Sequence, residues 1–371
     1  MNADTAHTLN QRLLANLNSN TTDLAQGELA VAAEVFFDPA RFAAEKAALF
    51  HRVPQPVAFA AEIPEPGSFL TLDVLDVPLL VTRSESGQLN AFINACAHRG
   101  ARVATGSGEC RRLICGFHGW AYSLEGELVG RPQERCFNTP REQCGLQRLP
   151  VSEKFGVVVV AMSPQVSQYQ VDTALDELAD DLDALQLAQF HPLERRQLSV
   201  QANWKLVNDL SLESYHFNVL HRDSVATVLA PNAVVDTFGH TSRWAFPFKT
   251  INRLETLSDQ DWPTGIEGSC TYTLYPGVML IVNATGAQLI RAEPGSAPDH
   301  SNVSYVGICA ADADREAVLA GYNFGGEVFQ NEDLPMAEQC QRGLEAGQRP
   351  LVIGTNEPLL QIWHRLWDEA L

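Results

Sequence analysis

Two short motifs, Cys96-Ala97-His98 and Cys115-Gly116-Phe117-His118, constrain this chain more than any other feature of its sequence. Sixteen residues separate them, and each pairs one thiol with one imidazole. Two thiolates can hold one iron of a [2Fe–2S] cluster while two imidazoles hold the other iron, an arrangement that raises the reduction potential. The two motifs therefore predict an iron–sulfur centre that transfers single electrons.

A tetrahedral zinc site is the alternative, because two Cys and two His also suit zinc. Zinc sites of that composition usually take Cys with Cys and His with His at short spacing, whereas each motif here supplies one of each. Glycines beside the ligands, Gly100 and Gly116, allow backbone N–H groups to approach inorganic sulfides. The mixed pairing favours a Rieske-type [2Fe–2S] cluster, and a visible spectrum would distinguish it from colourless zinc.

Composition excludes several classes of protein. The 371 residues carry a formal net charge of −19, which argues against nucleic-acid binding because such proteins present a basic face. Apolar runs such as residues 157–162 have the length of strands, whereas a membrane span needs about 20 residues. The N-terminal residues lack a signal-peptide pattern, and the six remaining cysteines show no disulfide framework. We expect a cytoplasmic protein with reduced thiols that binds no membrane.

Local sequence patterns divide the chain into three parts and predict an α+β fold. Short strands separated by Gly, Pro and Asp turns predict a small all-β domain over residues 46–163 that holds both ligand motifs. A larger α+β catalytic domain, an antiparallel sheet with covering helices, is predicted over residues 164–371, and a helical segment over residues 1–45 is expected to pack on it. The β domain would then be an insertion. Within the larger domain we predict strands at 197–206 and 271–280 and helices at 171–187, 313–321 and 334–344.

A second cluster of candidate ligands lies between Asp209 and His221. Asp209, Glu213 and His216 are spaced i, i+4 and i+7, which places them on one face if the segment is helical. His221 lies about 140° farther round such a helix, so both imidazoles reach one ion only if the helix ends or bulges. Two imidazoles and one carboxylate with open coordination positions suit non-haem Fe(II) and O2. Paired histidines are often core or surface residues, but beside the Cys/His motifs this pattern favours iron.

The two Cys/His motifs together with Glu213-x2-His216-x4-His221 resemble the oxygenase components of Rieske non-haem iron oxygenases, from about residue 35 onward. The resemblance implies that Asp333 is the third iron ligand, with Glu332 as its nearest competitor. A helix cap before Pro335 is the structural alternative for Asp333.

The same resemblance implies roles for the acidic residues near His216. Asp209 and Glu213 are the candidate catalytic carboxylates. Glu213 is expected to join His216 to His118 of a neighbouring subunit in a head-to-tail homotrimer, because one carboxylate can accept hydrogen bonds from two imidazoles. The chain departs from many relatives at Leu210, where they carry an Asn.

The implied activity is that of a terminal oxygenase. An NAD(P)H-dependent flavin/iron–sulfur reductase would pass electrons, directly or through a ferredoxin, to the cluster, and O2 would be activated at the mononuclear Fe(II) to hydroxylate, dihydroxylate or demethylate a small molecule. This chain has no dinucleotide-binding glycine motif, so the reductase must be another polypeptide. The alternatives are a Rieske electron-transfer protein without oxygen chemistry, which would need neither the length nor the triad, and a zinc-bearing interaction protein.

The substrate is less constrained by the sequence. Arg291 could hold a carboxylate with its planar guanidinium, although a strand Arg is more often part of a structural pair. Aromatic residues could instead cage a quaternary ammonium group, as in carnitine- and betaine-oxidising relatives, although such residues are more often core. We expect an aromatic or carboxylated small molecule, with a quaternary ammonium compound as the alternative. The candidate cage residues are Trp244, Phe246, Phe248, Tyr272 and Tyr275.

Overall fold

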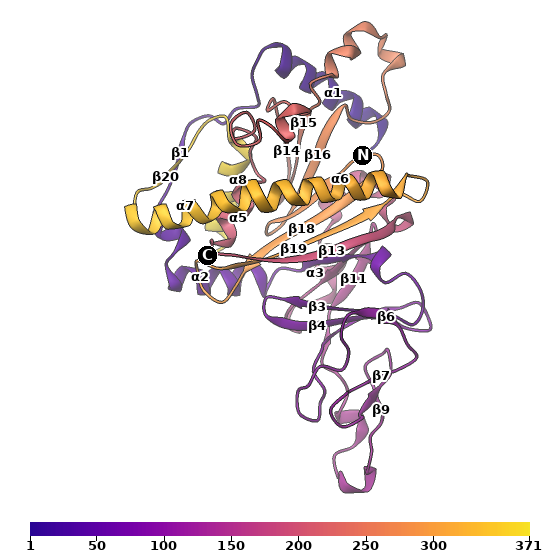
Figure 1. Cartoon of the computed structure of the whole chain (residues 1–371). Helices are drawn as coiled ribbons and strands as arrows, with labels where there is room; N and C mark the ends of the chain where they lie inside the picture. The colour runs from indigo at the N-terminus through magenta and orange to yellow at the C-terminus, as the bar shows by residue number, and fades with distance from the viewer. The chain divides into compact units, whose positions relative to one another are not determined.

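The chain forms two units, which Figure 1 shows in a computed structural model that describes residues 1–371. Residues Phe50–Ala174 make the smaller unit, and Met1–Leu49 cluster with Leu175–Leu371 to make the larger one. The N-terminal segment thus belongs with the C-terminal part of the chain, and the smaller unit interrupts the larger in sequence. Its first boundary lies 4 residues after the predicted one at 46, and its second lies 11 residues after the predicted one at 163. No helix has the length and apolar character required to cross a bilayer.

The smaller unit consists of antiparallel sheets of short strands. Alternating burial along Ser68–Val74 (β3) shows the period of two expected for a strand with one buried face. A two-residue turn at Leu75 and Asp76, both with positive φ, returns the chain into β4. The sheets have the orders β10-β5-β4-β3-β6, β11-β12-β2 and β7-β8-β9. The strand bounds are β2 Gln55–Phe59, β4 Val77–Arg83, β5 Leu89–Ile93, β6 Ser107–Glu109, β7 Leu113–Ile114, β8 Ala121–Tyr122, β9 Leu128–Gly130, β10 Arg148–Leu149, β11 Val151–Lys154 and β12 Val157–Val160, followed by helix α3 at Gln168–Asp172.

A seven-stranded antiparallel sheet of order β13-β19-β18-β17-β16-β15-β14 forms the centre of the larger unit. Register places Trp244 opposite Thr271 and Arg243 opposite Tyr272, so alternate residues of neighbouring strands face opposite sides. The bounds are β13 His191–Val200, β14 Val234–Phe238, β15 Thr241–Pro247, β16 Gly268–Leu274, β17 Val278–Val282, β18 Gly286–Pro294 and β19 Ser301–Cys309, and a separate pair joins β1 Leu29–Val31 to β20 Leu351–Ile353.

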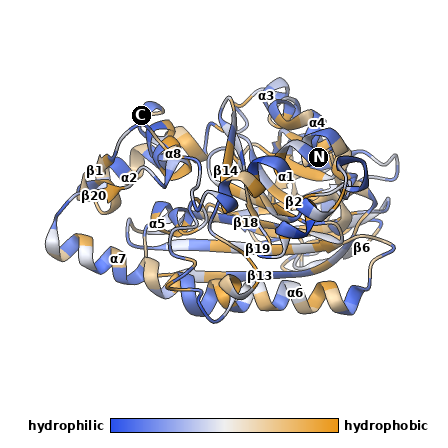
Figure 2. Ribbon diagram, turned by 90° about the horizontal axis from the view of Figure 1, so that it is seen from above, coloured by the Kyte–Doolittle hydropathy of each residue, from blue (hydrophilic) through white to orange (hydrophobic).

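Helices cover both faces of this sheet, as Figure 2 shows. Leu9 and Leu13 of α1 pack with Ala245 of β15 and Val234 of β14 on one side. On the other, Tyr322 of α6 stacks on Tyr305 of β19, with ring centroids 4.5 Å apart. The helices are α1 Ala3–Asn18, α2 Pro39–Glu45, α4 Ala179–Leu185, α5 Trp204–Asp209, α6 Arg315–Val328, α7 Leu334–Gly347 and α8 Pro358–Glu369.

Several predicted elements differ from those in the structure. The helix predicted over 171–187 is broken into α3, a 3-10 turn and α4, and the strand predicted over 271–280 is the β16–β17 hairpin. The strand predicted over 197–206 ends at Val200. Helix α5 starts at Trp204 because the Asn203 side chain caps it by accepting a hydrogen bond from the Lys205 N–H.

A buried ion pair anchors α5. The ammonium of Lys205 and the indole N–H of Trp204 both donate to the buried carboxylate of Glu45, at 2.6 and 3.0 Å. Burial lowers the pKa of Lys205 to about 8, although the Glu45 charge acts in the opposite direction. This anchored helix leads directly into the loop that carries His216 and His221.

Candidate metal centres

In the smaller unit, two turns of the same construction carry the Cys/His motifs. The Gly100 N–H donates to the Cys96 carbonyl at 2.8 Å, and the Gly119 N–H donates to the Cys115 carbonyl at 2.9 Å. Each glycine lies four residues after its cysteine and has a positive φ, a conformation that only glycine adopts readily. The first turn follows β5 and the second joins β7 to β8, so different sheets present the two halves of the site.

The donor atoms of these turns fit a Rieske cluster. The Cys96 and Cys115 thiols are buried and contact each other, while the rings of His98 and His118 meet with their Nδ1 atoms 3.1 Å apart. The Tyr122 hydroxyl lies 3.2 Å from the Cys96 sulfur and accepts a hydrogen bond from the Ala97 N–H. Two thiols and two converging imidazole nitrogens are the ligands that such a cluster requires.

An aromatic stack supports the first histidine from inside the unit. The Trp120 ring lies parallel to His98 with centroids 5.0 Å apart, and the Arg131 guanidinium lies 5.4 Å from the centre of the Trp120 ring. Arg131 also pairs with Glu134 at 2.8 Å. By contrast, Phe117 beside the second histidine is 55% exposed. His98 therefore packs on a buried ring, whereas His118 lies beside an exposed one.

In the larger unit, His216 and His221 lie at the two ends of a single helical turn. Helix α5 ends at Asp209, so the helical face predicted to hold Asp209, Glu213 and His216 does not form. The chain then passes through irregular turns, and the Leu220 N–H donates to the His216 carbonyl at 2.8 Å. This turn brings the two imidazoles within 4.8 Å, centroid to centroid.

Asp333 completes the group from a segment more than a hundred residues away. It ends the π-helical turn η11 (Phe329–Asp333), which joins α6 to α7 in one long helix. Pro335 has no N–H to bond the previous turn, which is consistent with this local widening of the helix. The backbone of Asp333 is itself helical and its side chain accepts no capping hydrogen bond, so the alternative prediction of a helix cap does not apply.

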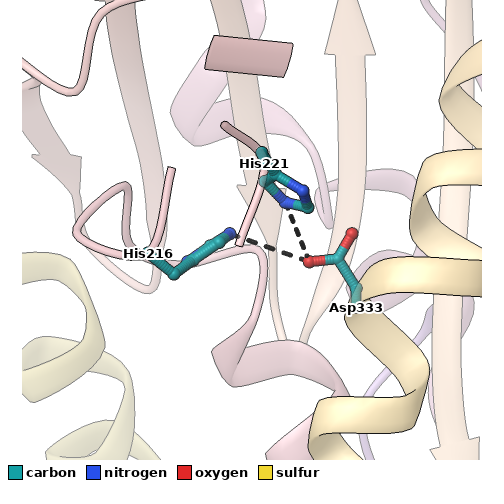
Figure 3. Close-up of side chains that lie close together, drawn as sticks. All are labelled: His216, His221 and Asp333. Atoms are coloured by element: carbon teal, nitrogen blue, oxygen red, sulfur yellow. Dashed lines mark ion pairs between the residues drawn. The ribbon is translucent and has the colours of Figure 1, made fainter. Parts of the chain in front are cut away.

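The three side chains converge as Figure 3 shows. An Asp333 carboxylate oxygen lies 3.1 Å from Nε2 of His221 and 3.7 Å from Nε2 of His216. One donor atom from each residue lies within 4.8 Å of the others. Two imidazoles and a carboxylate on one side of a point leave open positions on the other, a donor set that suits Fe(II).

Burial and hydrogen bonding oppose each other at this group. Burial raises the pKa of Asp333, although its hydrogen bond with His221 acts in the other direction. Burial also disfavours the charged form of His221, but hydrogen bonds to Asp333 and Glu332 outweigh it and raise the pKa of the ring. A cation bound here would therefore compete with a proton.

Each imidazole has a second carboxylate on its outer nitrogen. Glu213 hydrogen-bonds Nδ1 of His216 and also accepts from the Tyr215 and His216 N–H groups. Glu332 lies 2.7 Å from Nδ1 of His221. Asp209, the other predicted acidic residue, instead contacts Nε2 of His364 at 3.0 Å. From the sequence Glu332 is predicted only as a competing ligand, because spacing cannot reveal which nitrogen of His221 it contacts.

The residues proposed to bind substrate lie in different places. Arg291 on β18 is buried and bonds Glu293 of the same strand at 2.9 Å. Trp244 and Phe246 form a cluster with Phe217, whereas Tyr272 is on the opposite face of the sheet. Tyr275 contacts His240 and Trp363. The predicted aromatic residues thus do not form one cage.

Phe217 was not among the predicted site residues, although it follows His216 in the sequence, and its ring lies against both imidazoles. Its ring centroid is 5.1 Å from that of His216 and 5.7 Å from that of His221. The ring of Phe246 follows at 5.2 Å from Phe217, and that of Trp244 at 4.7 Å from Phe246. The indole Nε1 of Trp244 is buried and has no hydrogen-bond partner in the protein. The three rings form an aromatic wall beside the triad.

Comparison with known proteins assigns each unit. Residues 53–150 match the family described as Rieske [2Fe-2S] domain, and residues 187–371 match Ring hydroxylating alpha subunit (catalytic domain). The glycine betaine monooxygenase oxygenase subunit of Chromohalobacter salexigens is 30% identical over 58% of this chain and 49% of its own length. The anthranilate 1,2-dioxygenase large subunit of Acinetobacter baylyi is 32% identical over 54% and 44%. The matched region thus spans about half the length of these relatives.

A solved structure shares the fold along nearly the whole chain. The quaternary ammonium Rieske monooxygenase CntA in complex with L-carnitine has a TM-score of 0.79, with 20% identity over 94% of this chain and 97% of that one. The ligand geometry alone does not distinguish a zinc site from an iron–sulfur cluster. The two family matches decide in favour of the cluster. This chain belongs to the ring-hydroxylating alpha-subunit family of Rieske oxygenases, whose two domains carry a [2Fe–2S] cluster and a mononuclear iron.

Proposed function

We propose that this chain is the terminal oxygenase component of a multi-protein system, taking electrons from a separate NAD(P)H-dependent reductase and using O2 to hydroxylate, dihydroxylate or demethylate a small organic substrate. The convergence of His216, His221 and Asp333 carries the proposal. An electron-transfer protein without oxygen chemistry would need no second site of this kind. The two-His, one-carboxylate set is the one that non-haem Fe(II) oxygenases use.

In this proposal each unit has one task. Cys96, Cys115, His98 and His118 would hold the cluster, and the triad would hold the mononuclear iron. The bound groups would supply one-electron transfer and O2 activation. The chain's own residues orient the ligands: Tyr122 fixes the Cys96 loop, and Glu213 keeps the proton of His216 on Nδ1, so that Nε2 faces Asp333.

We propose that the substrate binds against the aromatic wall of Phe217, Phe246 and Trp244. Its rings suit an aromatic substrate, and the unpartnered Nε1–H of Trp244 suits an oxygen acceptor such as a carboxylate. We do not include Arg291 in this substrate site, because its guanidinium already donates a hydrogen bond to Glu293. A quaternary ammonium substrate is the second candidate, because aromatic faces also attract such cations.

A substrate panel tests both candidates. Purified protein with a surrogate reductase would be given aromatic carboxylates, quaternary ammonium compounds and their neutral analogues, while O2 uptake, NADH consumption and product are measured. We expect tightly coupled product from an aromatic or carboxylated compound, and a loss of about 10-fold or more in kcat/KM in Phe217→Ala. The exposed Phe324 provides a control variant that should leave the kinetics unchanged. Absence of substrate-dependent O2 uptake across the panel would contradict the proposal.

We further propose a cytoplasmic homotrimer in which one subunit's cluster serves the triad of its neighbour. Exposed apolar side chains support this assembly: Phe117 lies beside His118, while Tyr215 and Val219 near His216 are 70% and 84% exposed. The cytoplasmic location follows from the need for an NAD(P)H-dependent partner. Light scattering of the purified protein should give three chains or a multiple of three, and a monomeric active species would contradict this assembly.

A further inference from the structure

One imidazole of the candidate iron site is held at both nitrogens by consecutive residues of η11. Asp333 lies 3.1 Å from Nε2 of His221, and Glu332 lies 2.7 Å from Nδ1 of the same ring. One imidazole cannot direct both nitrogens at a single ion, since they lie on different edges of the ring. Glu332 is therefore on the far side of His221 from the triad and is not placed to be a ligand.

A second hydrogen bond fixes the Glu332 carboxylate. The Ser224 hydroxyl donates to the same oxygen, Oε2, at 2.8 Å. Ser224 lies three residues after His221, and its N–H donates to the His221 carbonyl at 3.0 Å. The carboxylate thus ties the long helix to the turn that carries the histidine, through the His221 ring and the Ser224 hydroxyl.

We propose that Glu332 is a positioning residue that fixes the tautomer and orientation of His221 for the metal. A carboxylate only accepts hydrogen bonds, so this contact requires the proton of His221 on Nδ1 and leaves the Nε2 lone pair directed at the triad. Carboxylate partners of this kind typically change metal affinity or activity by 10- to 100-fold. The inference rests on the proposed iron site. It gives Glu332 an orienting role on His221 alone, whereas Glu213, which orients His216, is also proposed to contact His118 of a neighbouring subunit.

Iron binding measures this role directly. Wild type, Glu332→Ala, Glu332→Gln and Ser224→Ala would be freed of mononuclear iron, titrated anaerobically with Fe(II) against a chelator, and examined by EPR with nitric oxide as a probe. We expect Glu332→Ala to weaken Fe(II) binding about 10- to 100-fold and to change the EPR line shape, with the visible spectrum of the cluster intact. Glu332→Gln should be intermediate, because its amide oxygen can accept from Nδ1–H while its nitrogen can favour the wrong tautomer. Ser224→Ala should weaken Fe(II) binding a few-fold.

Two comparisons interpret the result. Glu327→Gln, an exposed residue of the same long helix, should match wild type. Asp333→Ala should remove more iron than Glu332→Ala, and equal losses would make Glu332 a ligand and overturn the inference. Binding within twofold of wild type and an unchanged EPR signal in Glu332→Ala would also overturn it. If Glu332→Ala does not fold, unchanged Fe(II) binding in both Glu332→Gln and Ser224→Ala would overturn the inference. Failure of the wild type itself to bind Fe(II) would instead contradict the proposed function.

Discussion

The two candidate metal centres of this chain are built in opposite ways. The Rieske ligands come from two turns close in sequence, each closed by its own glycine, and their histidines lie near the surface. The triad joins a turn after α5 to a helix more than a hundred residues away, and His221 and Asp333 are buried. Aromatic rings support the first centre, whereas carboxylates hold the outer nitrogens of the second. The difference fits the proposed roles, because a centre that exchanges electrons with other proteins must be accessible, whereas a centre that activates O2 is better enclosed.

Loss of a thiolate should have the largest effect on one centre and none on the other. In Cys96→Ser or Cys115→Ser we expect the red-brown colour to disappear, because the cluster requires both sulfurs. Wild type should contain about three irons per chain, two in the cluster and one in the triad. Visible absorption and iron analysis measure both quantities. A colourless, folded wild type filled with zinc would show that the smaller unit holds a zinc site.

Loss of a triad ligand should reverse that outcome. His221→Ala should remove the mononuclear iron and abolish turnover while the visible spectrum persists, because the ligands of the two centres lie in separate units. Asp333→Ala should also abolish turnover but retain some metal on the two remaining imidazoles. Unchanged iron content and turnover in both variants would mean that the mononuclear site lies elsewhere.

The same contrast explains what could be predicted from the sequence. The Cys/His turns are local, so the spacing of Cys96, His98, Cys115 and His118 already gives their chemistry. The His216 and His221 pair could also be identified from local spacing, but the backbone conformation that carries the two residues could not be predicted from it. Helix α5 stops at Asp209, whose carboxylate contacts His364, and the hydroxyl of Ser214 donates to the Pro231 carbonyl at 2.8 Å.

Tertiary contacts account for the remaining differences. They override helical spacing because Asp209 and Ser214 bond groups 155 and 17 residues away, which no local pattern reveals. The contact between Glu332 and His221 spans 111 residues and had no periodic signal. By contrast, the start of α5 has a local signal, because Asn203 precedes an apolar run and caps the helix. The strand predicted at 197–206 was wrong beyond Val200 because it did not take this signal into account.

Replacement of Glu213 should affect mainly the electron transfer between the two centres, and each centre should still be able to hold its metal. With Fe(II) supplied in excess so that both sites are filled, we expect Glu213→Gln and Glu213→Ala to keep both metal centres and the wild-type colour, but to show roughly 10- to 100-fold slower reoxidation of the reduced cluster when substrate and O2 are supplied. The reason is that Glu213 holds Nδ1 of His216 and would accept a second imidazole N–H from His118 of a neighbouring subunit. Rapid-mixing absorption spectroscopy follows this step. Reoxidation at the wild-type rate would exclude Glu213 from the route.

The smallest effect should come from Arg131, which does not contact a cluster ligand directly and lies behind the ring of Trp120. Its guanidinium lies over Trp120, which stacks on His98, so its positive charge favours the reduced state of a nearby cluster. Arg131→Gln should therefore lower the midpoint potential. Because the carboxylate of Glu134 pairs with Arg131 and offsets much of its charge, we expect a shift of about 40 mV or less, equivalent to about 1 kcal/mol for a one-electron couple. Redox titration monitored by EPR measures it, with Arg102→Gln as a control because Arg102 pairs with exposed Asp73. A potential that is unchanged, or that falls equally in the control, would show that the aromatic stack supports the fold of the Rieske unit without tuning its electron transfer.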